Sequence, residues 1–425
     1  MESILQGGGI QASDRENRSF REALERESDF RIRRAVERLR EGLFDPVAVR
    51  LLTAHENRLR EETERGFRAV DAGKSPHLCV VGAYGQGKSH SLTYIQDRAS
   101  REGFVTSMVN LDPREVPFQN FREVYRALTA GLRFPDTEAS FIVQWKRWAQ
   151  QQMAESQDPV NAPADVLPKE MPHLFKSVLV AMAHRNLPLS EKEKRLKKHA
   201  AFRPKEFPVL LARALAGETV PYHRLRNVFK YRRVPFFKEA PLTLCGTEPF
   251  FQMTRSLGRL LRNMGYRGWV LLFDEGESIV QANVLLRSKA YKLLHRFFSP
   301  EEPDPSFLYP VFAFTEDFFH QVRQEDYDQV RVRGEVEIPY FDRNYAQEWR
   351  ELTVYRLSDL SREEWEDLSR KLMDLHARAY RWQPPEAEVH REMANRLSTM
   401  SRQETRLKLK ALVDCLDLAY QEQVL

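Results

Sequence analysis

Apolar residues near the start of the chain recur with a helical period. The period begins near Asp29 and predicts a helix with inward positions Ile32, Ala35, Val36, Leu39 and Leu43. A second helix is expected over 46–70, where Glu and Arg stand at spacings that allow i,i+4 pairs. Gly and Pro follow both segments, as they do at helix ends.

Short unbroken apolar runs predict buried strands. Such runs suit parallel strands that are covered on both faces. The predicted strands are 77–81, 104–111, 269–273 and 307–314, and further helices are expected over 90–102, 121–131 and 250–264. Strand, glycine-rich loop, helix and strand follow in the order of a doubly wound α/β sheet, in which Pro310 is unusual for a central strand.

Two long regions lack the pattern of strands. The stretch 135–240 has helical periodicity and several prolines, so a mostly helical insertion is expected there. After Tyr340 the pattern again looks entirely helical, with apolar periodicity over 349–357, 365–379 and 407–418.

Composition narrows the class of protein. Hydrophobic residues make up 42% and charged residues 30% of 425, as in a soluble protein with a real core. Three scattered cysteines support neither a disulfide framework nor a zinc site. The start lacks a signal peptide, and no run reaches the roughly 18 apolar residues of a membrane span. A cytoplasmic protein without membrane contact is expected.

Charge is unevenly distributed along the chain. The segment Arg185–Lys238 holds fifteen Lys and Arg against four Glu, a net +11, so the remainder carries about −6 of the total +5. Nucleic acid is the first candidate partner for this stretch, 185–238. A solvated helical face and a contact with an acidic neighbouring subunit are the alternatives.

The segment 82–89 matches G-x-x-x-x-G-K-[ST] in full and stands between a predicted strand and a predicted helix. Glycines let successive N–H groups turn toward phosphates, and the helix N-terminus favours negative charge. Lys88 would reach the β- and γ-phosphates of ATP, and the Ser89 hydroxyl would bind Mg²⁺. The expected nucleotide-binding residues are Gly82, Tyr84, Gly85, Gln86, Gly87, Lys88, Ser89 and His90. A chance glycine-rich turn is the alternative.

Acidic residues follow the strand 269–273 directly. We expect this strand to lie next to the strand of the phosphate loop. Asp274 would then hold Mg²⁺, and Glu275 would orient and polarise the attacking water. Glu277 either supports the metal or adds loop charge. The alternative is a strand that simply ends in solvated acids.

Further polar residues could complete a hydrolytic site. Thr315 follows the next strand and either contacts the γ-phosphate, as a sensor, or caps the following helix. Arg331 and Arg333 are candidates for an arginine finger inserted into a neighbouring subunit, or for surface ion pairs. Arg406 could reach the γ-phosphate from a helical lid or form a structural ion pair. The histidines, such as His90, His184 and His320, have no partners at metal-ligand spacing.

Taken together, these residues resemble an AAA+ ATPase of the origin-recognition and STAND branch. The segments 80–90, 110–128 and 265–277, with the close at 405–417, are more closely similar to the BrxD-like ATP-binding proteins of BREX phage-defence systems. The resemblance implies an ATPase that acts with other defence proteins on phage DNA, with an oligomer as one arrangement. Thr405 stands where such lid helices often begin with proline.

The predicted fold is therefore α/β, a P-loop AAA+-type parallel sheet flanked by helices, with a helical insertion and a C-terminal helical lid. The expected parts are an N-terminal helical segment (1–50), an ATPase core in two parts (51–135 and 241–340), a basic helical insertion (136–240) and the lid (341–425). The first functional hypothesis is a Mg²⁺-dependent, homo-oligomeric ATPase of a BREX-like system, working with partner proteins on DNA. The alternative is a nucleotide-gated scaffold or STAND-like switch that binds ATP with little turnover.

Overall fold

The structure is a computed structural model of the chain. It describes residues 20–424 except 44, 54–55, 188–190, 192–193, 196–204, 235–237, 239–243, 301–304, 326–329, 334–335 and 401–403. The chain divides into two compact units that do not follow its linear order. Unit 1 comprises Met1–Glu62, Val80–Asp97 and Tyr355–Leu425, and unit 2 comprises Thr63–Cys79 and Arg98–Val354.

Five strands build the central sheet: β1 (Leu78–Val81), β2 (Val105–Asn110), β3 (Trp269–Asp274), β4 (Leu308–Phe314) and β7 (Val354–Arg356). Their order is β2-β3-β4-β1-β7, and β3 pairs in parallel with both β2 and β4. All of β1 and β4 is buried, as is β3 up to its last residue. The predicted α/β class with a parallel sheet is confirmed.

Two details of the sheet differ from the sequence prediction. β4, not β3, is the neighbour of β1, so one strand separates β1 from the acid-bearing strand in the order of the sheet. The second difference is β7, which lies in a segment that was expected to be helical. Pro310 stands in a central strand as predicted, opposite Leu271.

The strand β7 is short and lies at the edge of the sheet. Its neighbourhood is fixed by backbone hydrogen bonds from Cys79 N to Thr353 O and from Leu357 N to Val81 O, each 2.8 Å long. A strand of three residues is too short to show the alternation that identifies strands in a sequence. The strand lies within the segment 341–425 that was predicted as the lid.

The helices of unit 2 that follow the core strands in the chain are α6 (Phe121–Ala130), α13 (Glu248–Asn263), α14 (Val284–Phe298) and α15 (Glu316–Gln324), with η2 (Gly276–Gln281) after β3. The helix α5 (Lys88–Arg101) follows β1 and lies mostly in unit 1. An aromatic cluster packs within unit 2. The rings of Phe273 and Phe312 stack at 4.5 Å, and Phe118 and Phe297 contact both of them. Burying one such side chain stabilises the fold by roughly 1.5 to 3 kcal/mol before entropy is counted. The cluster packs β3 and β4 together through Phe273 and Phe312.

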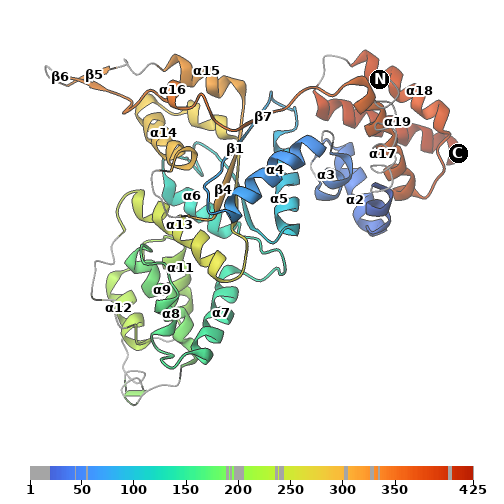
Figure 1. The fold of residues 1–425 in the computed structure, drawn as a ribbon. Coiled ribbons are helices and arrows are strands. Elements are labelled where there is room, and N and C mark those ends of the chain that lie inside the picture. Colours follow the sequence, from blue (N-terminus) through green and yellow to red (C-terminus); the bar gives the residue numbers. More distant parts are fainter. Residues whose placement is uncertain are drawn as a thin grey trace, which may run out of the picture. The chain divides into compact units, whose positions relative to one another are not determined.

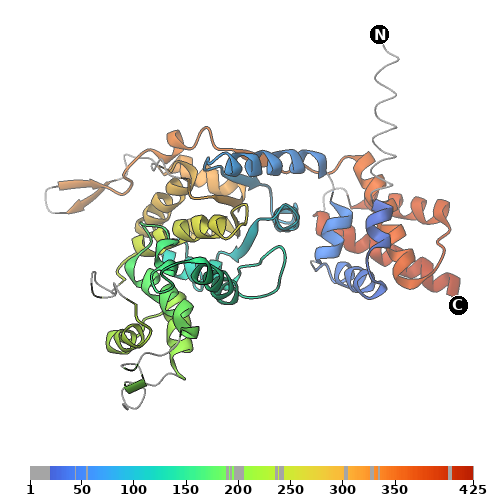
Figure 2. The ribbon, with the colours of Figure 1, turned by 60° about the horizontal axis from the view of Figure 1, so that its bottom comes forward.

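The insertion is a separate group of helices in unit 2: α7 (Phe141–Glu155), α8 (Ala162–Asp165), α9 (His173–Ala183), η1 (His184–Asn186), α11 (Phe207–Leu215) and α12 (Tyr222–Tyr231). Figures 1 and 2 show them gathered around α9, which is buried along most of its length. The indole N–H of Trp145 donates to Leu179 O at 2.9 Å. No strand occurs in the described part of 135–240, as predicted.

In unit 1, the N-terminal helices pack with the C-terminal helices. The members are α2 (Asp29–Arg40), α3 (Pro46–Leu52), α17 (Arg362–Tyr380), α18 (Glu386–Thr399) and α19 (Thr405–Val424). Figure 1 shows these helices grouped together. They share one hydrophobic core, which includes Val36, Leu51, Leu372, Met393 and Leu412. The helix expected over 46–70 is two helices, α3 and α4 (Glu56–Asp71), because the backbone is extended at Thr53.

A polar network crosses this helical bundle. The guanidinium of Arg40 donates to both carboxylate oxygens of Asp417, at 2.6 and 2.7 Å, and to the Tyr380 hydroxyl. His376 Nε2 donates to Asp417 Oδ1 at 3.0 Å, while His376 Nδ1 accepts from the Trp382 indole. Because Arg40 and Asp417 lie on α2 and α19, the network joins the two ends of the chain.

The remaining elements are α16 (Tyr345–Glu348) and an antiparallel pair of strands, β5 (Val330–Arg333) and β6 (Val336–Pro339), outside the core sheet. The sequence did not predict this pair. None of the described helices is long and apolar enough to cross a membrane.

Candidate nucleotide site

The glycine-rich loop connects β1 to α5 in the predicted arrangement. Gly85 and Gly87 have φ values of 75° and 104°, which side-chain-bearing residues rarely adopt, so glycine is required at both positions. The helix α5 begins at Lys88, directly after the loop. Its first N–H groups therefore end at the loop, as anion binding requires.

Lys88 is buried and its Nζ lies 3.3 Å from the carbonyl oxygens of Gly82 and Ala83. These carbonyl contacts hold the ammonium group at the base of the loop. Ser89 lies in the first turn of α5 and keeps part of its surface exposed. Tyr84 stands on the outside of the loop with 69% of its surface exposed.

The Gln86 side chain makes two hydrogen bonds that hold the loop in place. Its Oε1 accepts from Ala83 N at 2.7 Å, and its Nε2 donates to Asp359 Oδ1 at 3.0 Å. Asp359 lies between β7 and α17, so the start of the lid holds the phosphate loop. A second lid carboxylate, Glu404, lies so close that a Cβ on Gly85 would stand 2.5 Å from its Oε2. Neither acid was predicted to contact the loop, because nothing in the local sequence pattern identifies either one as a contact residue.

The His90 side chain is hydrogen-bonded to Thr53. The Thr53 hydroxyl donates to Val49 O, so it accepts from His90 Nε2–H at 2.9 Å. Burial lowers the pKa of His90 to about 4, which keeps the ring neutral at neutral pH. The residue that follows Ser89 is thus tied to the end of α3.

In unit 2, the expected catalytic acids stand at the end of β3. Asp274 Oδ1 accepts from Glu275 N at 3.0 Å, and Leu111 N donates to Asp274 O. Glu275 has φ 56° and ψ 37°, a left-handed conformation that is uncommon for a residue with a side chain. Such strained positions cluster at functional sites.

The turn after Glu275 is possible because the next residue is glycine. A Cβ on Gly276 would stand 2.6 Å from both Ala313 O and Phe314 Cε1. The backbone of the acidic turn therefore lies directly against the end of β4. Glu277 follows within η2 and is partly buried.

Thr315 stands at the carboxyl end of β4, beside this turn. It is the N-cap residue of α15, but its side chain makes no capping hydrogen bond. The capping role that we considered for its hydroxyl is therefore not observed. Because β3 and β4 are parallel neighbours, Asp274 and Thr315 end at the same edge of the sheet.

The three candidate arginines fall in different places. Arg331 and Arg333 lie on β5 of the separate strand pair, and their side chains are outside the described part of the structure. The stem of Arg406 packs on Gly42, 3.6 Å from where a Cβ would be, and the residue is exposed. This places Arg406 at the end of α2 within unit 1.

Two of the predicted metal ligands offer the kind of donor that a hard cation takes. The Ser89 side chain, in unit 1, is a hydroxyl, and the Asp274 side chain, in unit 2, is a carboxylate, and Mg²⁺ prefers oxygen ligands of this kind. Among the described residues, no group of three or more His, Cys, Asp or Glu side chains could hold a metal.

The fold and the glycine-rich loop define a P-loop nucleotide-binding protein of the AAA+ type. Comparison with protein families then gives the particular group: the family described as BREX system ATP-binding protein BrxC/D matches residues 29–188 and 245–425. The chain belongs to this family and is thus an ATP-binding protein of a BREX defence system. No curated protein and no solved structure matched the chain.

The match skips 189–244, which contains most of the basic stretch 185–238. The family comparison therefore does not cover most of that stretch.

Proposed function

We propose that this protein is a Mg²⁺-dependent ATPase that works in the cytoplasm, as a homo-oligomer and with other defence proteins, on DNA. The observation that carries the proposal is the turn Asp274–Glu275–Gly276. Asp274 would hold Mg²⁺ and Glu275 would orient the attacking water, and the left-handed backbone of Glu275 is a strained conformation of the kind that clusters at functional sites.

Each side chain has a defined part in the proposed reaction. Backbone N–H groups of 85–89 and the Lys88 ammonium bind the phosphates, and Ser89 and Asp274 would hold Mg²⁺, which neutralises charge on them. Glu275 accepts a proton from the attacking water and orients it. Thr315 contacts the γ-phosphate or that water. Arg331 or Arg333 of a neighbouring subunit, or Arg406, would stabilise the negative charge of the transition state.

The test is phosphate release by the full-length protein and by Glu275→Gln. Loss of a general base lowers turnover about 10²- to 10⁴-fold, while ATP affinity stays within a few fold because the phosphate loop is unchanged. Glu316→Gln is the matched control, since Glu316 is an exposed carboxylate at the end of the neighbouring strand. Unchanged hydrolysis in Glu275→Gln would remove Glu275 from the reaction.

Contact with DNA is the second part of the proposal, and helix α12 supports it. Arg224, Arg226 and Lys230 are exposed along this helix. At its end, Arg232 Nη1 donates to Arg185 O at 3.0 Å, which gathers the two arginines. Burial, and then the charges of Arg185 and Arg232, lower the pKa of Lys146 on α7.

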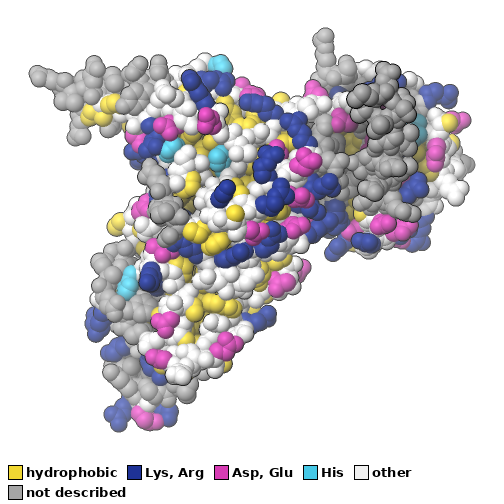
Figure 3. Space-filling model, viewed as in Figure 1, with side chains coloured by type: hydrophobic (Ala, Val, Ile, Leu, Met, Phe, Trp, Pro, Cys, Tyr) yellow, Lys and Arg dark blue, Asp and Glu magenta, His cyan; other side chains and the backbone are white. Residues whose placement is uncertain are grey.

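The positive charge is not an unbroken patch. Figure 3 shows scattered Lys and Arg side chains on the visible face of the α7–α12 group, with Asp and Glu side chains among them. Contacts from such cations to DNA phosphates would position the protein without reading the base sequence.

A salt titration of DNA binding tests this part. Replacing Arg224, Arg226 and Lys230 together by Gln should weaken binding and reduce the slope of log affinity against log salt by up to about 3. A matched triple replacement of the exposed residues Arg362, Arg391 and Arg396 in unit 1 should leave the slope unchanged. Equal effects of the two variants, or a flat salt response, would assign 185–238 to a protein interface instead.

A further inference from the structure

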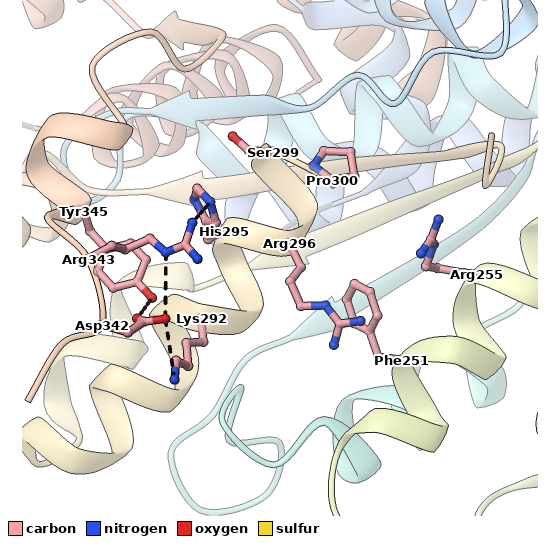
Figure 4. Close-up of a pocket in the computed structure, with 10 residues that line it drawn as sticks. All are labelled: Phe251, Arg255, Lys292, His295, Arg296, Ser299, Pro300, Asp342, Arg343 and Tyr345. Atoms are coloured by element: carbon pink, nitrogen blue, oxygen red, sulfur yellow. Dashed lines mark hydrogen bonds and ion pairs between the residues drawn. The ribbon is translucent and has the colours of Figure 1, made fainter. Parts of the chain in front are cut away.

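A cavity of about 270 Å³ lies in unit 2, away from the residues assigned to ATP. Figure 4 shows that its lining comes from three segments: α13, α14 with the residues after it, and the chain that leads into α16. The lining is Phe251, Arg255, Lys292, His295, Arg296, Ser299, Pro300, Asp342, Arg343 and Tyr345. The cavity is thus walled by cations and aromatic rings.

Positive charge exceeds negative charge in this cavity. Four cations line it, and Asp342 is the one carboxylate among the lining residues. Asp342 is shared between Lys292, at 3.5 Å, and Arg343, at 3.8 Å, and it also accepts from the Tyr345 hydroxyl. Outside the lining, Glu248 receives two hydrogen bonds from Arg296. The lining itself therefore holds four cations and one carboxylate.

Arg343 is held in place by a neutral acceptor. Its Nη1 lies 2.6 Å from His295 Nε2, while the Trp349 indole N–H lies 3.4 Å from His295 Nδ1. Guanidinium and indole only donate, and a neutral imidazole has one acceptor nitrogen. The shorter contact identifies Nε2 as that acceptor. The His295 ring therefore orients the Arg343 guanidinium and leaves its positive charge in place, whereas a carboxylate in that position would neutralise it.

Arg296 is also held in a fixed position. Its guanidinium carbon lies 3.8 Å from the centroid of the Phe251 ring, and its bidentate pair with Glu248 fixes the plane of the group. Two oriented guanidinium groups and a lysine around one cavity form a preorganised anion site, because little side-chain freedom remains to be lost on binding.

We propose that this cavity binds a phosphate monoester, at a site distinct from the phosphate loop. A phosphate monoester carries a charge of about −1.5 to −2, which suits a lining of four cations and one carboxylate. The cavity volume exceeds that of a phosphate group and approaches that of small-molecule sites, about 300 Å³ and more. A free sugar phosphate or nucleoside monophosphate and the 5′-phosphate end of a DNA strand share this chemistry.

Calorimetry tests the site in the full chain carrying Lys88→Ala, which removes phosphate binding at the loop. The probes are ribose 5-phosphate, and one oligonucleotide with a 5′-phosphate compared with the same oligonucleotide with a 5′-hydroxyl. Lys292→Gln and Arg255→Gln should each weaken binding of the recognised probe at least tenfold. Lys289→Gln is the matched control, because Lys289 is exposed one turn earlier on α14 and does not line the cavity.

The probes separate the two sources of phosphate. Binding of ribose 5-phosphate identifies a free metabolite, and preference for the phosphorylated oligonucleotide identifies a strand end. The proposal is overturned if neither probe binds in the millimolar range, or if Lys289→Gln weakens binding as much as Lys292→Gln.

Discussion

Replacing Gly276 by alanine is the sharpest structural probe of the catalytic turn. The added Cβ would stand 2.6 Å from Ala313 O and from the Phe314 ring, where ordinary contact begins at 3.4 Å. The turn and the end of β4 must therefore separate by up to about 0.8 Å, the difference of these distances. Overpacking of this kind costs about 1 to 3 kcal/mol.

The shift moves Glu275, and a displacement of about 1 Å at a reacting group costs roughly 10²-fold in rate. Steady-state phosphate release should therefore fall about 10²-fold in Gly276→Ala, while ATP affinity changes little because the phosphate loop is a separate segment. Gly265→Ala provides the control. Gly265 has φ 98° and no atom within 4 Å of an added Cβ, so alanine there costs about 1 to 2 kcal/mol without touching the turn.

Hydrolysis at the rate of the unmodified protein in Gly276→Ala would refute the assignment of the turn. An equal loss of rate in Gly265→Ala would show that activity follows stability rather than the position of Glu275.

Two further predictions concern stability. Burial lowers the pKa of His90 to about 4, so the neutral ring's contribution to folding stability is fully present above pH 6.5 and is lost as the pH falls toward 4. In urea unfolding, the free energy of unfolding should fall between pH 7.5 and pH 5 by roughly 2 kcal/mol less in His90→Asn than in the unmodified protein. Burial raises the pKa of Asp417, but hydrogen bonds from Arg40 and His376 outweigh it and lower the pKa below 3.8. Asp417→Asn should therefore lower the free energy of unfolding by about 2 kcal/mol at pH 7. This difference should disappear as the pH falls through the lowered pKa of Asp417 in acid. Asp414→Asn, three residues earlier on α19, should lower it little, and an equal loss of stability in both variants would contradict the role of the network.

Local sequence patterns predicted the features of the fold that depend on residues close together in the chain. The phosphate loop, the acidic turn and the main core strands depend on residue types within runs of a few residues, and the structure places 82–89 and Asp274 at the ends of strands as expected. The order of the strands in the sheet depends on contacts between distant segments. The apolar runs could therefore not predict that β4 lies between β1 and β3.

Contacts between distant residues were also missed. Arg40 and Asp417 are separated by 377 positions, and the packing of α2 on α17 and α19 has no signature in either segment alone. Asp359 and Glu404 look like ordinary surface acids in the sequence, and only the folded lid brings them to Gln86 and Gly85. The division into the five predicted segments stays a proposal.

The proposed enzyme differs from a nucleotide-gated switch in that it turns ATP over rather than holding it. The number of phosphates released per chain, when purified protein is mixed with excess ATP and Mg²⁺, alone and with DNA, distinguishes the two. We expect many turnovers per chain, abolished in Glu275→Gln while nucleotide remains bound. Release of at most one phosphate per chain, with nucleotide retained one to one, would contradict ATPase function and identify a switch.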